Sequence, residues 1–194
     1  MANTTEKRID YLRKDQAIID AMAELMLKQS IEKISINDIA KTAGINRGTF
    51  YLHYDDKYQV VESLENSLLA ELKEMNRALD TLVFHHLDPE KPYPFFVDTY
   101  QWIGQNKKYF AALLGSNGDL RFILQLRTVI EEAFARLLKK NGLFFHRQDI
   151  VMRAVTAIIL DFIVFYIEHC ETVSPEEMSI ICGRCVHGIT SQFQ

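Results

Sequence analysis

The amino-acid sequence predicts an all-helical protein, and composition and periodicity both support this prediction. Of the 194 residues, 48% are hydrophobic, which is enough to bury a core as one long domain or two short ones. Only 4 prolines and 8 glycines are present, whereas Leu, Ile, Ala, Glu and Lys are abundant. Apolar residues also recur at helical spacing along much of the chain. We therefore expect three short amino-terminal helices, one long connecting helix and a larger helical body.

The first helices can be placed from their periodicity and their caps. Over residues 13–29 the apolar side chains form one helical stripe. Ser35 and Asp38 then form a Ser-x-x-Asp start that resembles a capping box, in which each side chain satisfies a free backbone N–H of the other residue. Gly44 ends this short second helix.

The segment SINDIAKTAGINRGTFYLHY reads as a helix, a tight turn and a second helix. Ile39 faces inward from the first helix, Gly44 lets the chain turn, and Ile45 fills the corner. Asn46 is a good N-cap for the second helix, which should run to about His53. This order is the helix-turn-helix arrangement, whose second helix can enter the major groove of DNA.

A long connecting helix should follow, capped by Asp55 or Asp56 and ending near residue 83. Its apolar stripe consists of Val61, Leu64, Leu68, Leu72, Met75, Leu79 and Leu82. The segment 85–94, HHLDPEKPYP, holds three of the four prolines and is the one obvious linker. We expect its His85-His86 pair to be a solvated loop.

Five further helices are expected in the body. Gly115 and Asn141-Gly142 end helices there, and Ser174-Pro175-Glu176-Glu177 is a strong start. The approximate ranges are 94–105, 107–114, 119–140, 147–169 and 175–192. We expect two domains, residues 1–58 and residues 59–194.

Bulk charge does not favour a general nucleic-acid binder. The net charge is −4 and the isoelectric point is near 5.9. Residues 1–58 carry nine Lys and Arg against nine Asp and Glu, and residues 59–194 carry thirteen against seventeen. If the amino-terminal part binds an anion, local geometry rather than total charge must provide the affinity.

Two further features bear on the cellular compartment. No stretch reaches the ~20 apolar residues that a membrane span needs, and the beginning, MANTTEKRIDYLRKDQ, has no apolar segment of the signal type. The 3 cysteines are too few and too clustered for a disulfide framework. We therefore expect a cytoplasmic protein.

Helical geometry sorts the side chains of the second helix of the motif, because residues four apart share a face. Phe50 and Tyr54 are the most apolar pair and should pack on Ile39. The pairs on the side away from the core are Arg47 with Tyr51 and Thr49 with His53.

The phosphate of a DNA backbone is the ligand that suits this outward face. The hydrogen-bond donors that could hold it are Thr49, Tyr51, His53 and Lys57. Arg47 can contact guanine through two hydrogen bonds. Gly48, which costs roughly 1 kcal/mol inside a helix relative to Ala, suits a place where the backbone approaches a partner closely. Helix-turn-helix shapes also occur as plain packing motifs, so the residues alone leave that alternative open.

Residues 13–60, about a quarter of the chain, resemble the DNA-binding domain of TetR-family (AcrR-like) transcriptional regulators. The matching residues are Ser35, Ile39-Ala40, Ala43-Gly44-Ile45, Arg47-Gly48-Thr49-Phe50-Tyr51, His53-Tyr54 and Asp56-Lys57. Tyr54 stands where the family more often has Phe. The resemblance implies that DNA is contacted by Arg47, Gly48, Thr49, Tyr51, His53 and Lys57, and the predicted DNA-binding set also includes Ser35 and Asn46.

The helix expected at 147–169 is apolar nearly all round. From Ala154 to Ile167 only Thr156 and Asp161 are polar. Such a helix must be covered on all sides. It is too short to span a bilayer, so protein should cover it, either as a core helix of a monomer or through a second copy of the chain.

The family resemblance favours the second copy. TetR-family regulators dimerise through their last two long helices, here about 147–169 and 175–192. A two-fold dimer would present its reading helices ~34 Å apart to a near-palindromic double-stranded DNA operator. An effector bound in the carboxy-terminal body, either a small molecule or a protein, would then change their spacing through the connecting helix.

Candidate effector-pocket residues are the aromatic side chains of the 94–140 region and one carboxylate. An unpaired buried carboxylate is costly, so Asp161 should have a partner, line a cavity or sit at an edge. The predicted pocket set is Tyr100, Trp102, Phe110, Phe122 and Asp161, with Phe95, Phe96 and Tyr109 as further candidates. Aromatic residues at helical spacing are more often simple core. The stretch KKYFAALLGSNGD with Phe122 resembles regulators related to dihydroxyacetone-kinase operon activators, whose signal is a protein or is unknown.

Cys182-Gly183-Arg184-Cys185 is the remaining motif of chemical interest. A CxxC motif suits a redox pair or half of a zinc site. No second CxxC or histidine pair completes four ligands, and cysteines on an apolar helix face are usually small core residues. Gly183 then indicates a close approach of two helices.

The leading hypothesis is a dimeric transcriptional regulator, and the family resemblance favours a repressor that is released by an effector. The alternatives are an activator, a thiol or metal sensor that uses Cys182 and Cys185, or a helical protein with no DNA role. We expect no enzyme, no catalytic residues, no cofactor and no metal, because no catalytic set and no Gly-rich phosphate loop stands out.

Overall fold

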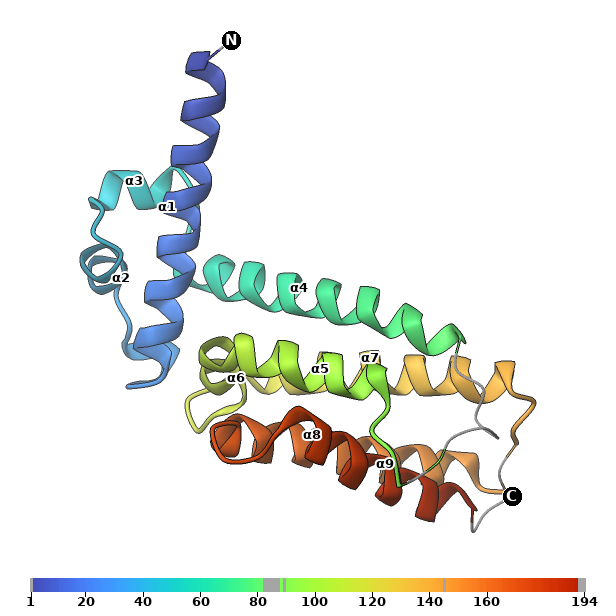
Figure 1. Ribbon diagram of the computed structural model, residues 1–194. Coiled ribbons are helices and arrows are strands. Elements are labelled where there is room, and N and C mark those ends of the chain that lie inside the picture. The colour runs from blue at the N-terminus through green and yellow to red at the C-terminus, as the bar shows by residue number, and fades with distance from the viewer. Residues whose placement is uncertain (1, 82–87, 89, 145, 192–194) are drawn as a thin grey trace. The chain divides into compact units, whose positions relative to one another are not determined.

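The computed structural model describes residues 2–81, 88, 90–144 and 146–191 (Figure 1). In this part of the chain the regular secondary structure is helical, and the all-α fold class is confirmed. Predictions about Leu82, the end of the connecting helix near residue 83, the His85-His86 pair and residue 192 lie outside the described residues.

Contacts between residues divide the chain into two compact units. The first comprises residues 1–68 and 108–120, and the second comprises residues 69–107 and 121–194. This division differs from a simple boundary at residue 58, because the segment 108–120 belongs by its contacts to the amino-terminal unit. The domain boundary at residue 58 stays a prediction.

The amino-terminal unit is built around one long helix, α1 (Ala2–Met26). A short 3₁₀ helix, η1 (Ile31–Lys33), leads into α2 (Ile36–Thr42) and α3 (Arg47–Tyr51). Both α2 and α3 lie on the same side of α1 (Figure 1). Helix α1 begins at Ala2, well before the stripe at 13–29 that the sequence indicates.

The connecting helix α4 (Lys57–Met75) continues directly into a 3₁₀ helix, η2 (Asn76–Thr81). The residues of the predicted stripe from Val61 to Leu72 are buried. Part of α4 therefore belongs to each of the two compact units, since the units divide between Leu68 and Leu69.

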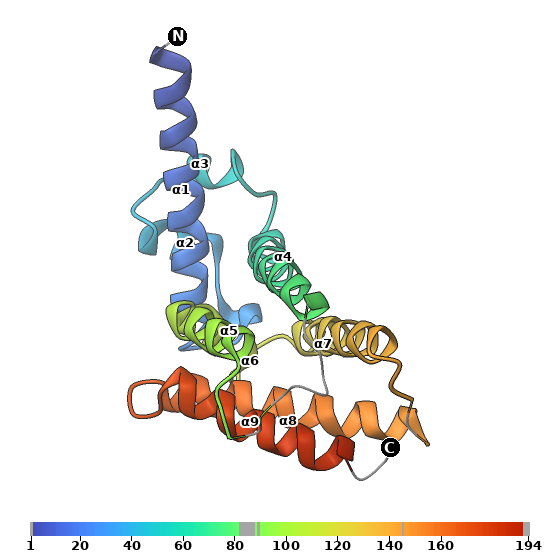
Figure 2. The same cartoon turned by 45° about the vertical axis from the view of Figure 1, so that its right-hand side comes forward.

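The remaining helices agree closely with their predicted ranges. They are α5 (Pro94–Gln105), α6 (Lys107–Leu114), α7 (Leu120–Lys140), α8 (Gln148–His169) and α9 (Pro175–Ser191). Helices α8 and α9 lie side by side in both views and are joined by a short turn (Figure 1 and Figure 2). Helix α5 packs against both of them.

Helix α8 corrects one sequence-based expectation. With 22 residues it is long and apolar enough to cross a membrane by length and composition, so the expectation that no segment reaches that length was wrong. Core helices of soluble proteins meet the same criterion. Asp161 of this helix is exposed, which agrees with the edge position among the three alternatives that the sequence left open.

Candidate nucleic-acid interface and effector cavity

Local hydrogen bonds fix the start of α2 and the start of α3. The backbone N–H of Ser35 donates to Asp38 Oδ2 at 3.0 Å, and the N–H of Asp38 donates to Ser35 Oγ at 3.2 Å, which confirms the predicted capping box. The N–H of Thr49 donates to Asn46 Oδ1 at 2.7 Å. Gly44 adopts a positive φ of 67°, a conformation that glycine takes at little cost. These features set the angle at which α3 leaves the turn.

The predicted inward pair is buried, with Phe50 inside α3 and Tyr54 three residues after the helix ends at Tyr51. The side chain of Phe50 is fully buried and Tyr54 is 8% exposed, and Ile39 of α2 is fully buried with them. Burial raises the pKa of the Tyr54 hydroxyl to about 12, although its hydrogen bond to Ser63 opposes this. The packing of Phe50 and Tyr54 toward the core is confirmed.

The outward face of α3 presents hydrogen-bond donors to solvent. Arg47 Nη2 donates to Tyr51 Oη at 3.0 Å, and the Arg47 guanidinium lies 5.5 Å from the centre of the Tyr51 ring. The Tyr51 side chain is 44% exposed, and Thr49 is half-buried beside it. Gly48 is exposed, and a Cβ atom there would lie 3.2 Å from Asn46 Oδ1. A flat partner can therefore approach this backbone closely.

His53 does not face outward as the spacing indicates. Its side chain is 2% exposed, it stacks on Tyr11 of α1 with 4.0 Å between ring centres, and its Nδ1 lies 3.2 Å from Asp15 Oδ1. The reason is that α1 begins before residue 13, so that its residues Tyr11 and Asp15 lie against the His53 ring. The role of His53 in DNA contact stays a prediction, but the structure gives its ring a packing role.

Lys57 is also held within the protein. Its Nζ donates to the backbone carbonyl oxygens of Glu32 at 3.0 Å and Ile34 at 2.8 Å. These acceptors lie in η1 and directly after it, and the sequence analysis did not anticipate η1. The ammonium therefore ties the start of α4 to the chain before α2. Its contact with phosphate stays a prediction.

A polar cluster that the sequence analysis missed joins α6 to α1 inside the amino-terminal unit. Tyr109 Oη donates to Asp20 Oδ1 at 2.6 Å, Gln16 Nε2 donates to Tyr109 Oη at 2.7 Å, and Lys108 forms an ion pair with Asp20. Partial burial raises the pKa of the Asp20 carboxyl, but the hydrogen bonds from Lys108 and Tyr109 outweigh it, so the pKa lies below its usual value. No local pattern predicts this cluster, because its partners lie about 90 residues apart.

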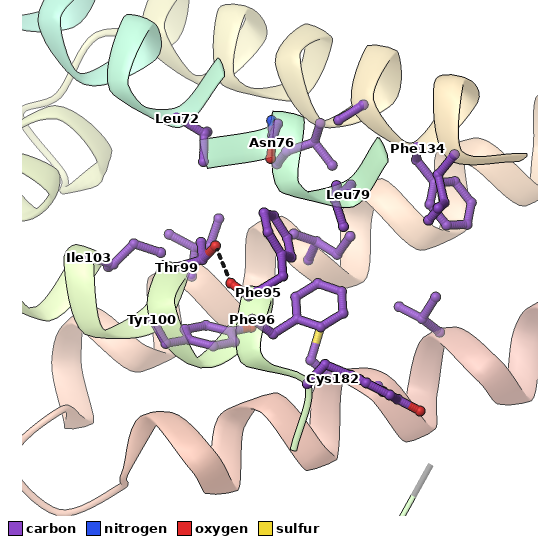
Figure 3. Close-up of a pocket in the computed structure, with 18 of the residues that line it drawn as sticks. Leu72, Asn76, Leu79, Phe95, Phe96, Thr99, Tyr100, Ile103, Phe134 and Cys182 are labelled. Carbon is purple, nitrogen blue, oxygen red and sulfur yellow. Dashed lines mark hydrogen bonds between the residues drawn. The ribbon is translucent and has the colours of Figure 1, made fainter. Parts of the chain in front are cut away.

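The carboxy-terminal unit contains an apolar cavity of about 80 Å³ (Figure 3). Helices α4, η2, α5, α7, α8 and α9 all contribute to its wall. Its lining is mainly aliphatic and aromatic, and includes Leu72, Leu79, Phe95, Phe96, Tyr100, Ile103, Phe134 and Ile163. The polar side chains in the wall are Asn76, Thr99, Cys182 and His187, besides two tyrosine hydroxyls.

One residue of the predicted pocket set lines this cavity, namely Tyr100. The indole of Trp102 instead turns to α4, where its Nε1 donates to Glu71 Oε2 at 2.8 Å. Phe110 and Phe122 are fully buried outside the lining, and Asp161 is exposed. Helical periodicity selects residues of an apolar face but cannot say which of them border a void, since that depends on the facing helices.

Two residues of the CxxC motif, Cys182 and Gly183, line the cavity. Cys182 is buried in the wall, and burial raises the pKa of its thiol to about 11, which disfavours the reactive thiolate. A Cβ atom on Gly183 would lie 2.9 Å from the Tyr93 ring, so the close approach expected there is confirmed. Within the described residues, His, Cys, Asp and Glu side chains form no group of three or more that could hold a metal.

Helices α8 and α9 leave large apolar side chains on the surface. Val164 and Phe165 of α8 are 38% and 42% exposed, and Ile181 of α9 is 46% exposed. Ile150, at the beginning of α8, is 49% exposed. This unpaired apolar surface lies on the two helices that the sequence analysis expects to form an interface.

Comparison with known families accounts for most of the chain. Residues 18–64 match the family described as bacterial regulatory proteins of the tetR family. Residues 90–188, just over half of the chain, match the family described as the C-terminal region of transcriptional regulators.

Curated relatives match mainly in the amino-terminal part. The HTH-type transcriptional regulator YvdT of Bacillus subtilis is 36% identical over 57 residues, which is 29% of this chain and 29% of that protein. The HTH-type transcriptional regulator AcrR of Shigella flexneri is 33% identical over 76 residues, covering 38% of this chain and 34% of AcrR. The matched segments thus span about a third of these relatives.

Solved structures match over nearly the whole chain. A TetR transcriptional regulator from Streptococcus agalactiae has a TM-score of 0.64 at 20% identity, covering 94% of this chain and 98% of that one. The complex of SmeT with triclosan has a TM-score of 0.65 at 13% identity, covering 93% and 91%. The dihydroxyacetone kinase operon activator DhaS has a TM-score of 0.56 at 16% identity, covering 93% and 96%. At these identities the likeness concerns the fold. With both parts of the sequence matched, the chain belongs to the TetR family of transcriptional regulators.

Proposed function

We propose that this protein is a sequence-specific DNA-binding transcriptional regulator that reads its operator with the exposed face of α3. The observation that carries the proposal is the division of α3 into two faces. Phe50 and Tyr54 anchor the helix, while Arg47 and Tyr51 remain exposed and hydrogen bonded to each other. A preorganised pair of this kind can contact a base edge and a phosphate without reordering the helix.

The test is binding of Tyr51→Ala to a duplex selected from random sequences. We expect specific binding to be lost, with helicity and thermal stability near wild type, because the Tyr51 side chain is largely exposed. Leu27→Ala is a matched control, since Leu27 is an apolar side chain of similar exposure directly after the end of α1. Binding should also weaken steeply with salt, because phosphate contacts release counterions. Unchanged binding by Tyr51→Ala would show that the wrong face was assigned.

We further propose that the protein acts as a homodimer through α8 and α9. The support is the exposed apolar surface that includes Val164, Phe165 and Ile181. Two-fold symmetry would make the operator nearly palindromic, with half-sites about one DNA turn apart. Sedimentation of Phe165→Glu tests this, since a charge in a buried interface should give monomers. A wild-type chain that sediments as a monomer at micromolar concentration would contradict the proposal.

We also propose that the regulator acts in the cytoplasm as a repressor. An effector that binds in the cavity of the carboxy-terminal unit would release it from DNA. Helix α5 lines the cavity and continues through Asn106 into α6, whose Tyr109 is hydrogen bonded to Asp20 of α1. Displacement of α5 can therefore reach the amino-terminal unit by this route as well as through α4. A reporter gene with the selected operator in its promoter distinguishes repression from activation. Reporter output that rises when the protein is deleted supports repression, and output that falls indicates an activator.

A further inference from the structure

The body of the cavity offers an occupant almost no polar partner. The hydroxyl of Thr99 donates to the backbone oxygen of Phe95 at 2.8 Å, drawn as a dashed line in Figure 3. Thr99 is therefore already engaged, and the lining side chains are otherwise hydrocarbon apart from Asn76, Cys182, His187 and the two tyrosine hydroxyls. The bulk of any occupant must therefore be apolar.

One end of the cavity is different. The amide of Asn76 lies at the point where α4 changes into the 3₁₀ helix η2, and its side chain is 5% exposed (Figure 3). Asn76 lines the apolar cavity and also lines a second, polar hollow of about 380 Å³. It is the residue that the two linings share.

The polar hollow is mainly cationic. Its lining comprises Lys73, Asn76, Arg77, Val129, Glu132 and Arg136, with three cations against one carboxylate. Arg77 is partly neutralised by an exposed ion pair with Glu74 at 3.0 Å. Lys73 has no ion-pair partner among the described residues, and such exposed pairs as Arg77–Glu74 are weak and exchange readily. The hollow can therefore accept an anionic group.

We propose that the effector is a small amphiphile with an apolar tail and a single anionic head. The tail occupies the cavity between α5 and α7, and the head lies beyond Asn76 in the hollow, beside Lys73 and Arg77. This inference rests on the proposed function only in taking the cavity as the effector site. A cavity of about 80 Å³ is small beside typical pockets of ~300–1,000 Å³, so a short unbranched tail fits best.

The first experiment measures binding of straight-chain carboxylic acids, from butanoic to dodecanoic acid, to the full chain. The protein contains 1 tryptophan, Trp102, which lies on α5 next to the lining residue Ile103, so its fluorescence reports occupancy. Calorimetry provides an independent readout. We expect each added methylene to tighten binding about four-fold until the cavity is filled. The primary alcohol of the same length should bind about ten-fold more weakly, because it lacks the charge. Equal binding of the acid and its alcohol would overturn the assignment of an anionic head.

The second experiment removes the cations. Lys73→Gln combined with Arg77→Gln should weaken acid binding about ten-fold and leave alcohol binding unchanged. Lys139→Gln is the matched control, since Lys139 is an exposed lysine of α7 outside both linings. If His187→Ala weakens acid binding and the double variant does not, the head lies beside His187 in the cavity and the assignment is wrong.

Duplex binding by the unliganded protein, measured in parallel, separates this inference from the proposed function. A protein that binds its operator but none of the acids remains a DNA-binding regulator, and the amphiphile assignment fails. A protein that binds the acids with the expected dependence on chain length and charge, but binds no duplex, keeps the ligand assignment and loses the regulatory function.

Discussion

The two compact units differ in how their helices are held. In the amino-terminal unit Ile18, Met22, Ile39 and Phe50 are fully buried, and a capping box and a histidine–tyrosine stack fix the short helices. In the carboxy-terminal unit a cavity remains between α5 and α7, the connecting helix becomes 3₁₀ at Asn76, and α8 exposes apolar side chains. A surface that reads DNA must keep its shape, whereas a body that binds a ligand needs space and alternative packing.

The largest expected effect tests how tightly the amino-terminal core is packed. Phe50→Ala should lower the free energy of unfolding by about 3–5 kcal/mol, because it leaves a large cavity among rigid helices. Leu52→Ala should change it by less than ~0.5 kcal/mol, since Leu52 is 76% exposed. Urea unfolding followed by circular dichroism measures both. A loss of free energy much smaller than this for Phe50→Ala would mean that the amino-terminal core rearranges to fill the cavity, and is not packed more tightly than the carboxy-terminal unit.

Replacing a buried alanine by leucine should change the stability of the protein in opposite directions in the two units. Ala23 of α1 is fully buried, so Ala23→Leu overpacks the core and should cost about 1–3 kcal/mol. Ala133 of α7 lines the cavity, so Ala133→Leu should stabilise the protein by about 0.5–2 kcal/mol by filling it. Thermal unfolding of the two variants compares them directly. If both substitutions destabilise equally, the cavity does not hold the extra carbon atoms and the contrast between the units fails.

The caps provide a comparison in which the two units should behave alike. Ser35 begins α2, and Ser174 begins α9 with a reciprocal pair in which Ser174 N–H donates to Glu177 at 2.9 Å and Glu177 N–H donates to Ser174 Oγ at 3.2 Å. Replacing either serine by alanine should cost about 1 kcal/mol, because one backbone N–H loses its partner. Denaturant unfolding with both single variants checks this. A much larger cost at one site would show that its helix start carries tertiary contacts as well.

The smallest effect concerns the cluster that joins α6 to α1, and it depends on pH. The pKa of Asp20 is lowered in the folded protein, so its ionised form stabilises folding at pH values above the usual carboxyl pKa of about 4. This stabilisation is lost as the pH falls through the lowered pKa. Because the Asp20 side chain is 41% exposed, Asp20→Asn should cost less than ~1 kcal/mol at neutral pH and nothing in strong acid.

Urea unfolding of Asp20→Asn and wild type across the acidic range provides the measurement. Asp38→Asn serves as a control, since Asp38 also has a lowered pKa but interacts only within its own helix start. A difference for Asp20→Asn that persists unchanged at low pH would show that geometry, rather than charge, holds the cluster together.

Local features of the sequence predicted most helix ends and the inward face of α3. Ser35 with Asp38, Asn46 and Gly44 act on backbone groups within a few residues, and the structure has each of them in the expected role. The orientation of His53 could not be predicted in this way. It depends on how far α1 extends, which brings Tyr11 and Asp15 against a residue about 40 positions away.

The sequence by itself therefore determined the all-helical class, the helix-turn-helix and the anchoring of α3 by Phe50 and Tyr54, because these follow from short-range hydrogen bonds and a 3.6-residue period. Only the tertiary structure decided that Tyr100 rather than Trp102 borders the cavity, that Cys182 is part of its wall, and that Tyr109 reaches Asp20. Voids and distant hydrogen bonds are properties of facing surfaces, and no single segment of the chain contains both surfaces.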